Sequence, residues 1–229
     1  MKGSILNSIK QSVTILGSAL PEGTLRSCEA VMGYLRIGRW MGRHGFRVSS
    51  RCSSRQEVWE QILQHISDKR ILYLEFGVAS GASISYWSQR LKHSESILHG
   101  FDSFEGLPEE GGRWKKGDFG VNGRIPEIPD SRVQFFKGWF DETLPKYTVP
   151  PHQQLVLNMD ADLYSSTSCV LDALRPWIKQ GTLIYFDDFF QVDHEPRAFE
   201  EFMAKTKLRF KLRAADQTFK YAFFECLGE

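Results

Sequence analysis

The chain has 229 residues, of which 41% are hydrophobic and 25% are charged, an ordinary balance for a globular protein. This length favours one α/β domain with an extension over two independent domains. The net charge of +1 excludes a molecule-wide field that would draw the protein to nucleic acid or to an anionic membrane.

The charge is unevenly distributed along the chain. Residues 1–55 carry nine Lys and Arg against two Glu, a net charge of +7, which leaves −6 for the remainder. Such a basic segment fits a membrane-surface helix, a solvated face, a subunit contact or a cover over a site. We expect residues 1–55 to form a helical extension, interrupted at 21–23 and 42–45, that serves as a lid or a dimer contact.

The four cysteines are scattered and form no C-x-x-C pair, so we expect free thiols in a reducing compartment. Lys10 interrupts the apolar N-terminus, no convincing cleavage site follows, and no long apolar run occurs elsewhere. These features predict a cytoplasmic protein without a membrane span.

From residue 56 onward, apolar residues at helical spacing alternate with short apolar runs. Helices are predicted at 56–66, 82–91, 141–147, 166–178 and 197–205. Strands are predicted at 71–76, 97–101, 133–136, 155–159, 183–186, 208–212 and 219–224. This alternation predicts an α/β fold at 56–229, a doubly wound and mostly parallel sheet of seven strands whose last strand is antiparallel.

A glycine-containing turn follows the first predicted strand, reading Glu75-Phe-Gly77-Val-Ala79-Ser80-Gly81. Small residues let the backbone turn sharply and approach a ligand closely, although structural turns of this kind are common. Ala79 stands where a dinucleotide fingerprint would have its second glycine. Asp102 directly follows the second strand, where a carboxylate can accept hydrogen bonds from both hydroxyls of a ribose. A turn or capping role for Asp102 is the alternative.

Four aspartates follow two strands that are neighbours in the predicted sheet. Asp160 and Asp162 end one strand, and Asp187 and Asp188 end the next. Carboxylates brought together repel one another unless a positive charge neutralises them. Oxygen ligands favour Mg²⁺, so we predict that Asp160, Asp187 and Asp188 bind it. The ion would lower the pKa of an acceptor hydroxyl, and Asp162 would act as general base. Helix capping by Asp162 and solvation of Asp188 are the alternatives.

Two further features lie near this edge of the sheet. Trp114 and Phe119 occur in the long loop between the second and third strands, either as a lid that grips an apolar acceptor or as packing for the loop itself. His194, shortly after Asp188, could approach the acceptor. The other five histidines lie away from the predicted site.

Five ordered motifs resemble the macrocin O-methyltransferase (TylF-like) family, over roughly residues 56–225. They are EFGVASG at 75–81, GFDSFEGLP at 100–108, KGWFDETLP at 137–145, DADLYSST at 160–167 and YFDDF at 185–189. The resemblance implies a Rossmann-like class I methyltransferase domain with S-adenosyl-L-methionine as donor and Mg²⁺ as cofactor. It also implies a small-molecule acceptor: a hydroxyl of a sugar, glycoside or phenolic natural product.

The resemblance also assigns residues. Asp160, Asp187 and Asp188 match the metal ligands, Asp162 the base and Asp102 the ribose-binding acid. The turn from Glu75 to Gly81 would face the methionine part, and Ser103 and Trp139 would contact the adenosine. A homodimer is expected, whereas residues 1–55 and 109–130 match no motif, so the acceptor, its regiochemistry and the pathway stay open.

Two other classes of function remain as alternatives. A nicotinamide-dependent oxidoreductase on a similar sheet would bind NAD(H), but the chain has no G-x-G-x-x-G and no Tyr-x-x-x-Lys pair. A non-catalytic module that retains the fold would bind the cofactor without turnover. The intact cluster of acids argues against this second alternative.

Overall fold

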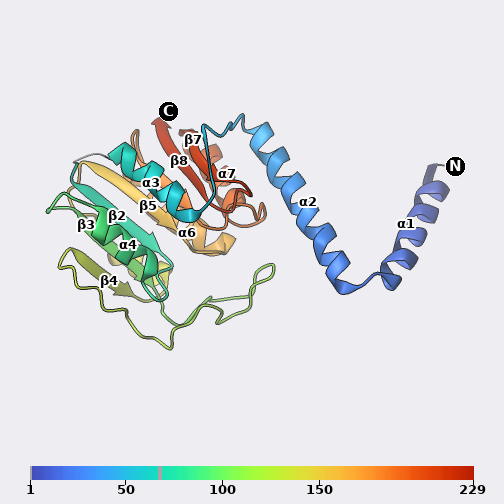
Figure 1. The fold of residues 1–229 in the computed structure, drawn as a ribbon, viewed down its shortest axis with the longest axis horizontal. Coiled ribbons are helices and arrows are strands. Elements are labelled where there is room, and N and C mark those ends of the chain that lie inside the picture. Colours follow the sequence, from blue (N-terminus) through green and yellow to red (C-terminus); the bar gives the residue numbers. More distant parts are fainter. Residues whose placement is uncertain (1, 67–68) are drawn as a thin grey trace.

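The computed structural model describes residues 2–66 and 69–229 (Figure 1). Its strands are β1 (Ser50–Cys52), β2 (Ile71–Phe76), β3 (Ile97–Asp102), β4 (Val133–Lys137), β5 (Gln154–Met159), β6 (Leu183–Phe186), β7 (Arg209–Asp216) and β8 (Ala222–Gly228). Its α-helices are α1 (Lys2–Ala19), α2 (Glu22–Arg43), α3 (Arg55–Ile66), α4 (Ala82–Arg90), α5 (Phe140–Thr143), α6 (Tyr164–Leu174) and α7 (Glu195–Thr206). Two single 3₁₀ turns, η1 (Leu144–Lys146) and η2 (Arg175–Trp177), extend α5 and α6.

The strands form one mixed sheet in the order β1-β7-β8-β6-β5-β2-β3-β4. Strand β8 lies antiparallel between β6 and β7, and the other neighbours run parallel. The α/β class, the parallel core and the antiparallel last strand are therefore confirmed. The sheet has eight strands rather than the predicted seven, because β1 pairs with β7 from within the segment predicted to be only helical.

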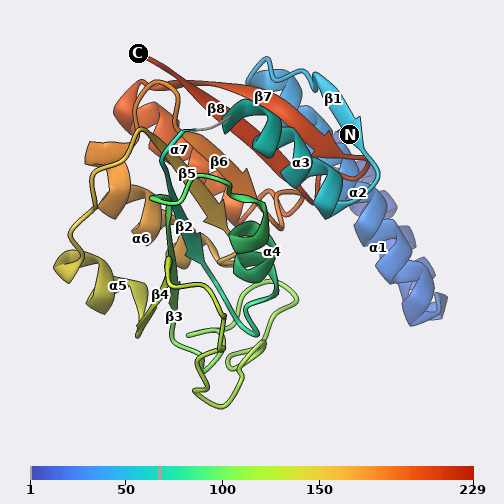
Figure 2. The same ribbon diagram turned by 60° about the vertical axis from the view of Figure 1, so that its left-hand side comes forward.

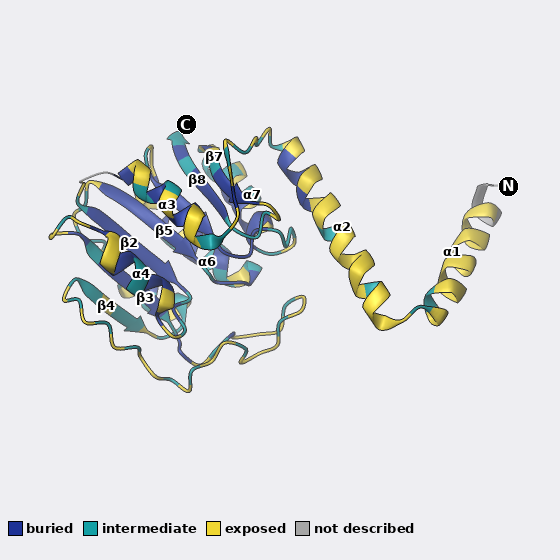
Figure 3. Ribbon diagram, in the orientation of Figure 1, coloured by how far each residue is buried: buried dark blue, intermediate teal, exposed yellow. Residues whose placement is uncertain are grey.

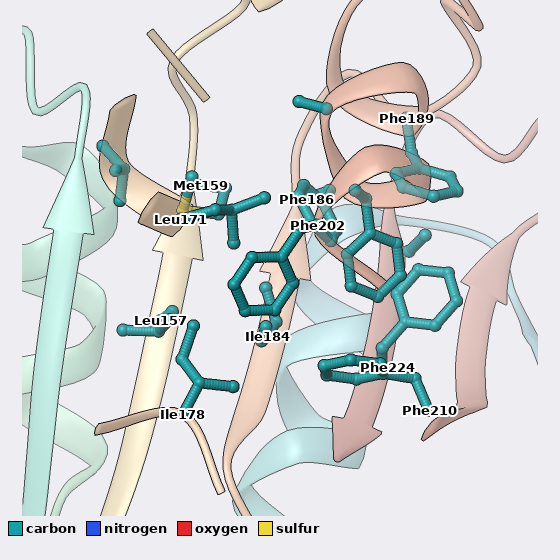
Figure 4. Close-up of a cluster of buried hydrophobic side chains, with 14 of the residues drawn as sticks. Leu157, Met159, Leu171, Ile178, Ile184, Phe186, Phe189, Phe202, Phe210 and Phe224 are labelled. Atoms are coloured by element: carbon teal, nitrogen blue, oxygen red, sulfur yellow. The ribbon is translucent and has the colours of Figure 1, made fainter. Parts of the chain in front are cut away.

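Helices cover both faces of the sheet, which explains why the central strands are apolar without alternation. In Figure 2, α3 and α4 lie on one side of the sheet, with α5, α6 and α7 on the other. All six residues of both β2 and β5 are buried. The aromatic cluster around Phe186, Phe189 and Phe224 fills the space beside β6 and β8 (Figure 4).

The order in which the chain places its strands creates a switch point near the middle of the sheet. From β2 the chain proceeds outward to β3 and β4, and then returns to place β5 on the other side of β2. The connections that leave β2 and β5 therefore diverge, and ligands of doubly wound sheets bind at such a switch point. Apart from Glu75, which lies within β2, the predicted site residues end or follow β2, β3, β4, β5 and β6, so they share this carboxyl edge.

The N-terminal helices α1 and α2 meet at Pro21 and extend away from the sheet (Figure 1). Only the last turns of α2 pack on the domain, through Ile37, Trp40 and Met41, and Trp40 Nε1 donates to Glu200 at 2.8 Å. The remainder of both helices is largely exposed (Figure 3). Among the described residues, no helix is both long and apolar enough to cross a membrane.

Candidate active site

A cavity of about 760 Å³ opens at the carboxyl edge of the sheet. Nine of the twelve predicted site residues line it: Gly77, Ala79, Asp102, Ser103, Trp139, Asp160, Asp162, Asp187 and Asp188. These residues follow five different strands, and it is the parallel sheet that brings them together. Glu75, Ser80 and Gly81 are not part of the lining.

The turn after β2 requires glycine at its first position. Gly77 has φ +92°, and a Cβ there would lie 1.9 Å from the backbone oxygen of Asp160. The backbone of Asp160 is itself fixed, because its N–H donates to the carbonyl of Phe76 at 2.9 Å. The glycine thus lets the turn lie directly against the connection that follows β5. At the other end of the turn, Gly81 (φ +80°) precedes α4, and Ser80 is exposed.

Glu75 lies beneath the turn, in the interior of the domain. Its carboxylate accepts hydrogen bonds from Tyr73 Oη at 2.5 Å, Ser83 Oγ at 2.6 Å and Asn158 Nδ2 at 3.1 Å. Burial raises its pKa to about 7, against the effect of these three donors and of Arg55. In this position Glu75 supports the turn from below.

Asp102 is a hydrogen-bond acceptor for the backbone of two loops. Its Oδ2 accepts from the N–H groups of Val78 and Ala79 at 2.7 and 2.8 Å, and its Oδ1 accepts from Phe104 N–H at 2.7 Å. A carboxylate offers about four acceptor positions. The turn role therefore uses most of the capacity of Asp102, and about one position remains for a ligand hydroxyl in the cavity.

Ser103 and Trp139 also line the cavity. Ser103 Oγ donates to the carbonyl of Gly106 at 3.2 Å and accepts from Glu105 N–H at 3.1 Å, which shapes the loop after β3. Trp139 immediately precedes α5, and its half-buried side chain faces the cavity.

The four predicted aspartates lie together in the lining of the cavity. Asp187 is held by Met159, whose carbonyl accepts its N–H at 2.9 Å, and Tyr185 Oη donates to its Oδ1 at 2.6 Å. Asp162 has φ +57°, a left-handed conformation that Asp tolerates better than most residues, and its side chain interacts with that of Asp188.

Burial and repulsion from neighbouring carboxylates raise the pKa values of Asp160, Asp162 and Asp188. Desolvation has the largest effect on Asp160, followed by the charges of Asp187 and Asp162, and its pKa lies well above the ordinary range. The pKa of Asp162 is raised to about 8, first by burial and then by its hydrogen bond to Asp188. Burial also raises the pKa of Asp188, although Lys220 opposes the rise. The cluster is therefore a place where positive charge is strongly favoured.

Two arginines from outside the sheet partly supply that charge. Arg55, at the start of α3, lies 3.4 Å from Asp187, and Arg113 lies 3.5 Å from Asp188. Within residues 2–66 and 69–229, no three His, Cys, Asp or Glu side chains are arranged around one point so as to hold a metal ion. The carboxylates are neighbours, but Asp187 and Asp188 pair with these two arginines instead of surrounding a common point.

Sequence reasoning missed four charged residues around the aspartates: Arg55, Arg113, Lys220 and Glu195. Glu195 is fully buried, and its Oε2 accepts the N–H of Asp188 at 3.2 Å. An acid within a predicted loop, seven residues beyond Asp188, was the available signal for it. Arg55 lies 132 positions before Asp187, and no local pattern links two residues so far apart.

The loop between β3 and β4 forms the outer wall of the cavity. Trp114 and Phe119 both line it, and their rings meet edge to face at 5.1 Å. The tip of the loop approaches His194 so closely that a Cβ at Gly112 would lie 3.0 Å from its Nε2. His194 is absent from the cavity lining and packs against this tip.

The comparisons with known proteins agree with this geometry. Residues 122–223 match the family described as Macrocin-O-methyltransferase (TylF). The chain is therefore similar to the TylF O-methyltransferases over less than half of its length. It is 31% identical to demethyldecarbamoylnovobiocin O-methyltransferase of Streptomyces niveus, over 51% of this chain and 50% of that protein. It is 33% identical to an 8-demethyl-8-(2,3-dimethoxy-alpha-L-rhamnosyl)-tetracenomycin-C 4'-O-methyltransferase of Streptomyces olivaceus, over 51% of this chain and 52% of that protein.

The chain spans about half the length of the curated relatives it matches. Among solved structures, the O-methyltransferase NovP has a TM-score of 0.59 at 23% identity, covering 76% of this chain and 79% of that one. The calicheamicin methyltransferase CalS11 also has a TM-score of 0.59, at 20% identity, over 96% of this chain and 91% of that one. These two likenesses show that the chain has the methyltransferase fold.

Proposed function

We propose that this TylF relative is an S-adenosylmethionine-dependent O-methyltransferase acting on a hydroxyl of a sugar or glycoside natural product. The observation that carries the proposal is one cavity lined by two chemically different groups of residues. Gly77 and Asp102 are suited to a nucleoside donor, and Asp160 and Asp162 are suited to an acceptor that loses a proton. The names of the relatives support the reaction class and the glycoside acceptor.

In this proposal the donor lies along the wall formed by Gly77, Ala79, Asp102, Ser103 and Trp139. The remaining acceptor position of Asp102 would take a ribose hydroxyl, and Trp139 would cover the adenine. Glu75, Ser80 and Gly81 contribute indirectly, since they shape the turn and do not line the cavity.

The transfer itself needs an oxygen nucleophile and a destination for one proton. An acceptor oxygen attacks the methyl carbon of the sulfonium, the S–CH₃ bond breaks, and its electron pair stays on sulfur. The hydroxyl proton passes to Asp162, the proposed general base. Asp162 must be ionised to accept it, and its pKa of about 8 means that a cation among its neighbours would favour the reactive form.

We further propose that Asp160, Asp187 and Asp188 hold Mg²⁺. Their oxygen-only chemistry suits this ion, and their burial and mutual repulsion leave a need for positive charge. When bound, the ion would neutralise the cluster and lower the pKa of the acceptor hydroxyl. A distant structure on the same fold, that of cmcI with Mg and SAM, has a TM-score of 0.51 at 13% identity, so the proposal depends on the carboxylates of this chain.

For the acceptor we propose a ring that packs on Trp114 and Phe119. Phe119 is 51% exposed, which is unusual for an aromatic side chain that faces a cavity. Sugar rings and aromatic aglycones both present flat apolar faces to such a pair. The free cysteines favour a cytoplasmic location. The exposed apolar side chains of α1 and α2 support a homodimer.

The test is transfer of labelled methyl from S-adenosylmethionine, with Mg²⁺, to a panel of glycosides and phenols. Asp160→Asn should abolish transfer and leave donor binding, measured by calorimetry, within about threefold. Asp172→Asn, a surface acid of α6 paired with Lys205, is the matched control and should transfer normally.

Each component of the proposal can fail separately. Absence of donor binding would refute the donor and with it the reaction. Donor binding without transfer to any acceptor of the panel would favour a non-catalytic module. Transfer that survives exhaustive chelation would remove Mg²⁺ from the mechanism and leave the methyltransferase intact.

A further inference from the structure

One cation of the cavity has no carboxylate partner. Arg55 lies 3.4 Å from a carboxylate oxygen of Asp187, and Arg113 lies 3.5 Å from one of Asp188. Lys220 also lines the cavity, and its side chain is half-buried. Within residues 2–66 and 69–229, however, no carboxylate oxygen lies within 4.0 Å of its Nζ. The two arginines are thus paired inside the protein, whereas the charge of Lys220 is available to a ligand.

The turn before β8 holds Lys220 in this position. The N–H of Phe189 donates to the carbonyl of Lys220 at 2.9 Å, so the lysine is tied to the residue that follows Asp188. Across the turn, Asp216 Oδ1 accepts the N–H of Tyr221 at 3.0 Å, and the N–H of Asp216 donates to the carbonyl of Tyr221, also at 3.0 Å. These bonds fix the backbone around Lys220, so its side chain starts from a defined point beside the acid cluster.

Tyr221 helps to orient the lysine. Lys220 Nζ lies 5.1 Å from the centre of the Tyr221 ring, and this ring stacks on Tyr185 with centroids 6.5 Å apart. Tyr185 in turn donates its hydroxyl hydrogen bond to Asp187. A cation is attracted to the face of an aromatic ring. Because a Lys ammonium has three N–H donors, it keeps donors for a ligand even with Tyr221 beside it.

The amine of Lys220 carries its proton. Burial lowers its pKa, but the electrostatic effects of Asp188, Tyr221 and Asp187 raise it by more. Lys220 is therefore an ammonium at neutral pH, which makes it a hydrogen-bond donor and not a second base.

The sheet places Lys220 at the acceptor end of the cavity. Strand β8 pairs with β6, β6 with β5, and β5 with β2. Because β8 runs antiparallel to β6, the start of β8 lies at the edge where β5 and β6 end. Lys220 comes two residues before β8, so the strands that carry the acid cluster separate it from the Gly77 turn, where the donor is proposed to bind. The order of the strands therefore places Lys220 nearer to the acceptor than to the donor.

We infer that Lys220 is a further catalytic residue, which donates a hydrogen bond to the acceptor oxygen as that oxygen gains negative charge. The inference rests on the proposed methyl transfer. One electron pair of the acceptor oxygen forms the bond to the methyl carbon, and another accepts from Lys220 Nζ. The hydroxyl proton passes to Asp162, the S–CH₃ bond breaks with its electron pair on sulfur, and Lys220 keeps its own protons. A charged donor that is fixed before the reaction stabilises such an oxygen better than water does.

The test compares Lys220→Met with the wild type in transfer of labelled methyl to whichever glycoside or phenol the wild type accepts. The kcat should fall about 100-fold, the usual effect of removing one donor from a developing oxyanion. Donor affinity, measured by calorimetry, should stay within about threefold of the wild type, which also shows that the domain is folded. The pH at which kcat reaches half of its plateau should rise by about one unit, because the hydroxyl would lose its proton less readily.

Two further variants serve as controls. Lys220→Arg keeps a charged donor and should be at least about tenfold faster than Lys220→Met. Lys211→Met removes an exposed lysine of β7, in the same hairpin, that does not line the cavity, and it should transfer normally.

Four outcomes would overturn the inference. An unchanged kcat in Lys220→Met, or equal kcat in Lys220→Met and Lys220→Arg, would do so and leave the proposed function intact. Loss of donor affinity in Lys220→Met would place the lysine on the donor instead. Recovery of wild-type kcat in Lys220→Met at high Mg²⁺ would show that the lysine only offsets the charge of the acids. A wild type that transfers methyl to no acceptor would refute the proposed function, and the inference with it.

Discussion

Glu75 makes the stability of the protein depend on pH in a way that one substitution can isolate. Its pKa is raised by burial from 4.5 to about 7. Between these values the native state keeps the proton that the unfolded state has lost. Stability from this group is therefore fully present below pH 4.5 and is lost as the pH rises through 7.

The size of the effect follows from the shift. About 2.5 pKa units at 1.36 kcal/mol each give about 3 kcal/mol, of which about 2 kcal/mol falls between pH 5.5 and pH 8. Glu75→Gln has the same shape and no charge, so its stability should lack this component. Gln can keep the contact with Ser83, whose hydroxyl is able to accept instead of donating.

The assay is urea unfolding of both proteins at several pH values from 5.5 to 8. The free energy of unfolding of Glu75→Gln, minus that of the wild type, should rise by about 2 kcal/mol across this range. The comparison with the variant is needed because His99 changes stability with pH in the opposite direction and so flattens the dependence of wild-type stability on pH. A difference that stays constant with pH would show that Glu75 is ionised in the native state, and the reasoning would be refuted.

Three further outcomes are expected. In urea unfolding, Gly77→Ala should lower stability by about 2 kcal/mol more than Gly181→Ala. Both glycines have positive φ, but of the two only Gly77 lies against a backbone oxygen. Equal losses of stability would contradict this close approach. Burial lowers the pKa of His99 from 6.5 to about 4, so between these values the unfolded chain binds a proton that the native state does not. From pH 7 to pH 5 the wild type should therefore lose about 2 kcal/mol of stability that His99→Gln keeps. An unchanged unfolding profile would refute this. Trp114→Ala should raise KM for the acceptor about tenfold or more and leave donor affinity unchanged, and an equal effect on both would place Trp114 elsewhere.

Much of the sheet could be predicted because its strands are buried on both faces. Runs such as 71–76 and 183–186 are continuously apolar, and helices with a separate periodicity lie between them. Strand β1 could not be found in this way. It has three residues, with Arg51 exposed between a partly exposed and a buried neighbour, and it is a strand only because β7 lies beside it.

The acid cluster was predictable because parallel neighbours end at one edge. The direction of a single side chain was harder to foresee, and Glu75 shows why. Residues two apart in a strand share a face, so Glu75 lies with Tyr73, on the face covered by α3 and α4, and not at the edge. Strand periodicity already contained this information. The commitment of Asp102 to three backbone N–H groups did not follow from any pattern, since it depends on how two loops meet.

The folded protein brings cations from distant parts of the chain to the acid cluster. Six acids lie together, and three cations reach them from α3, the loop after β3 and the turn before β8; the acids are Glu75, Asp160, Asp162, Asp187, Asp188 and Glu195, and the cations are Arg55, Arg113 and Lys220. Strand ends alone predicted that a positive charge neutralises the acids and favoured a metal ion as that charge. The cations offset half of the charge, and the raised pKa values show that protons offset part of the remainder. A divalent ion and protons compete for that remaining charge, so an ion bound here would displace protons from the cluster.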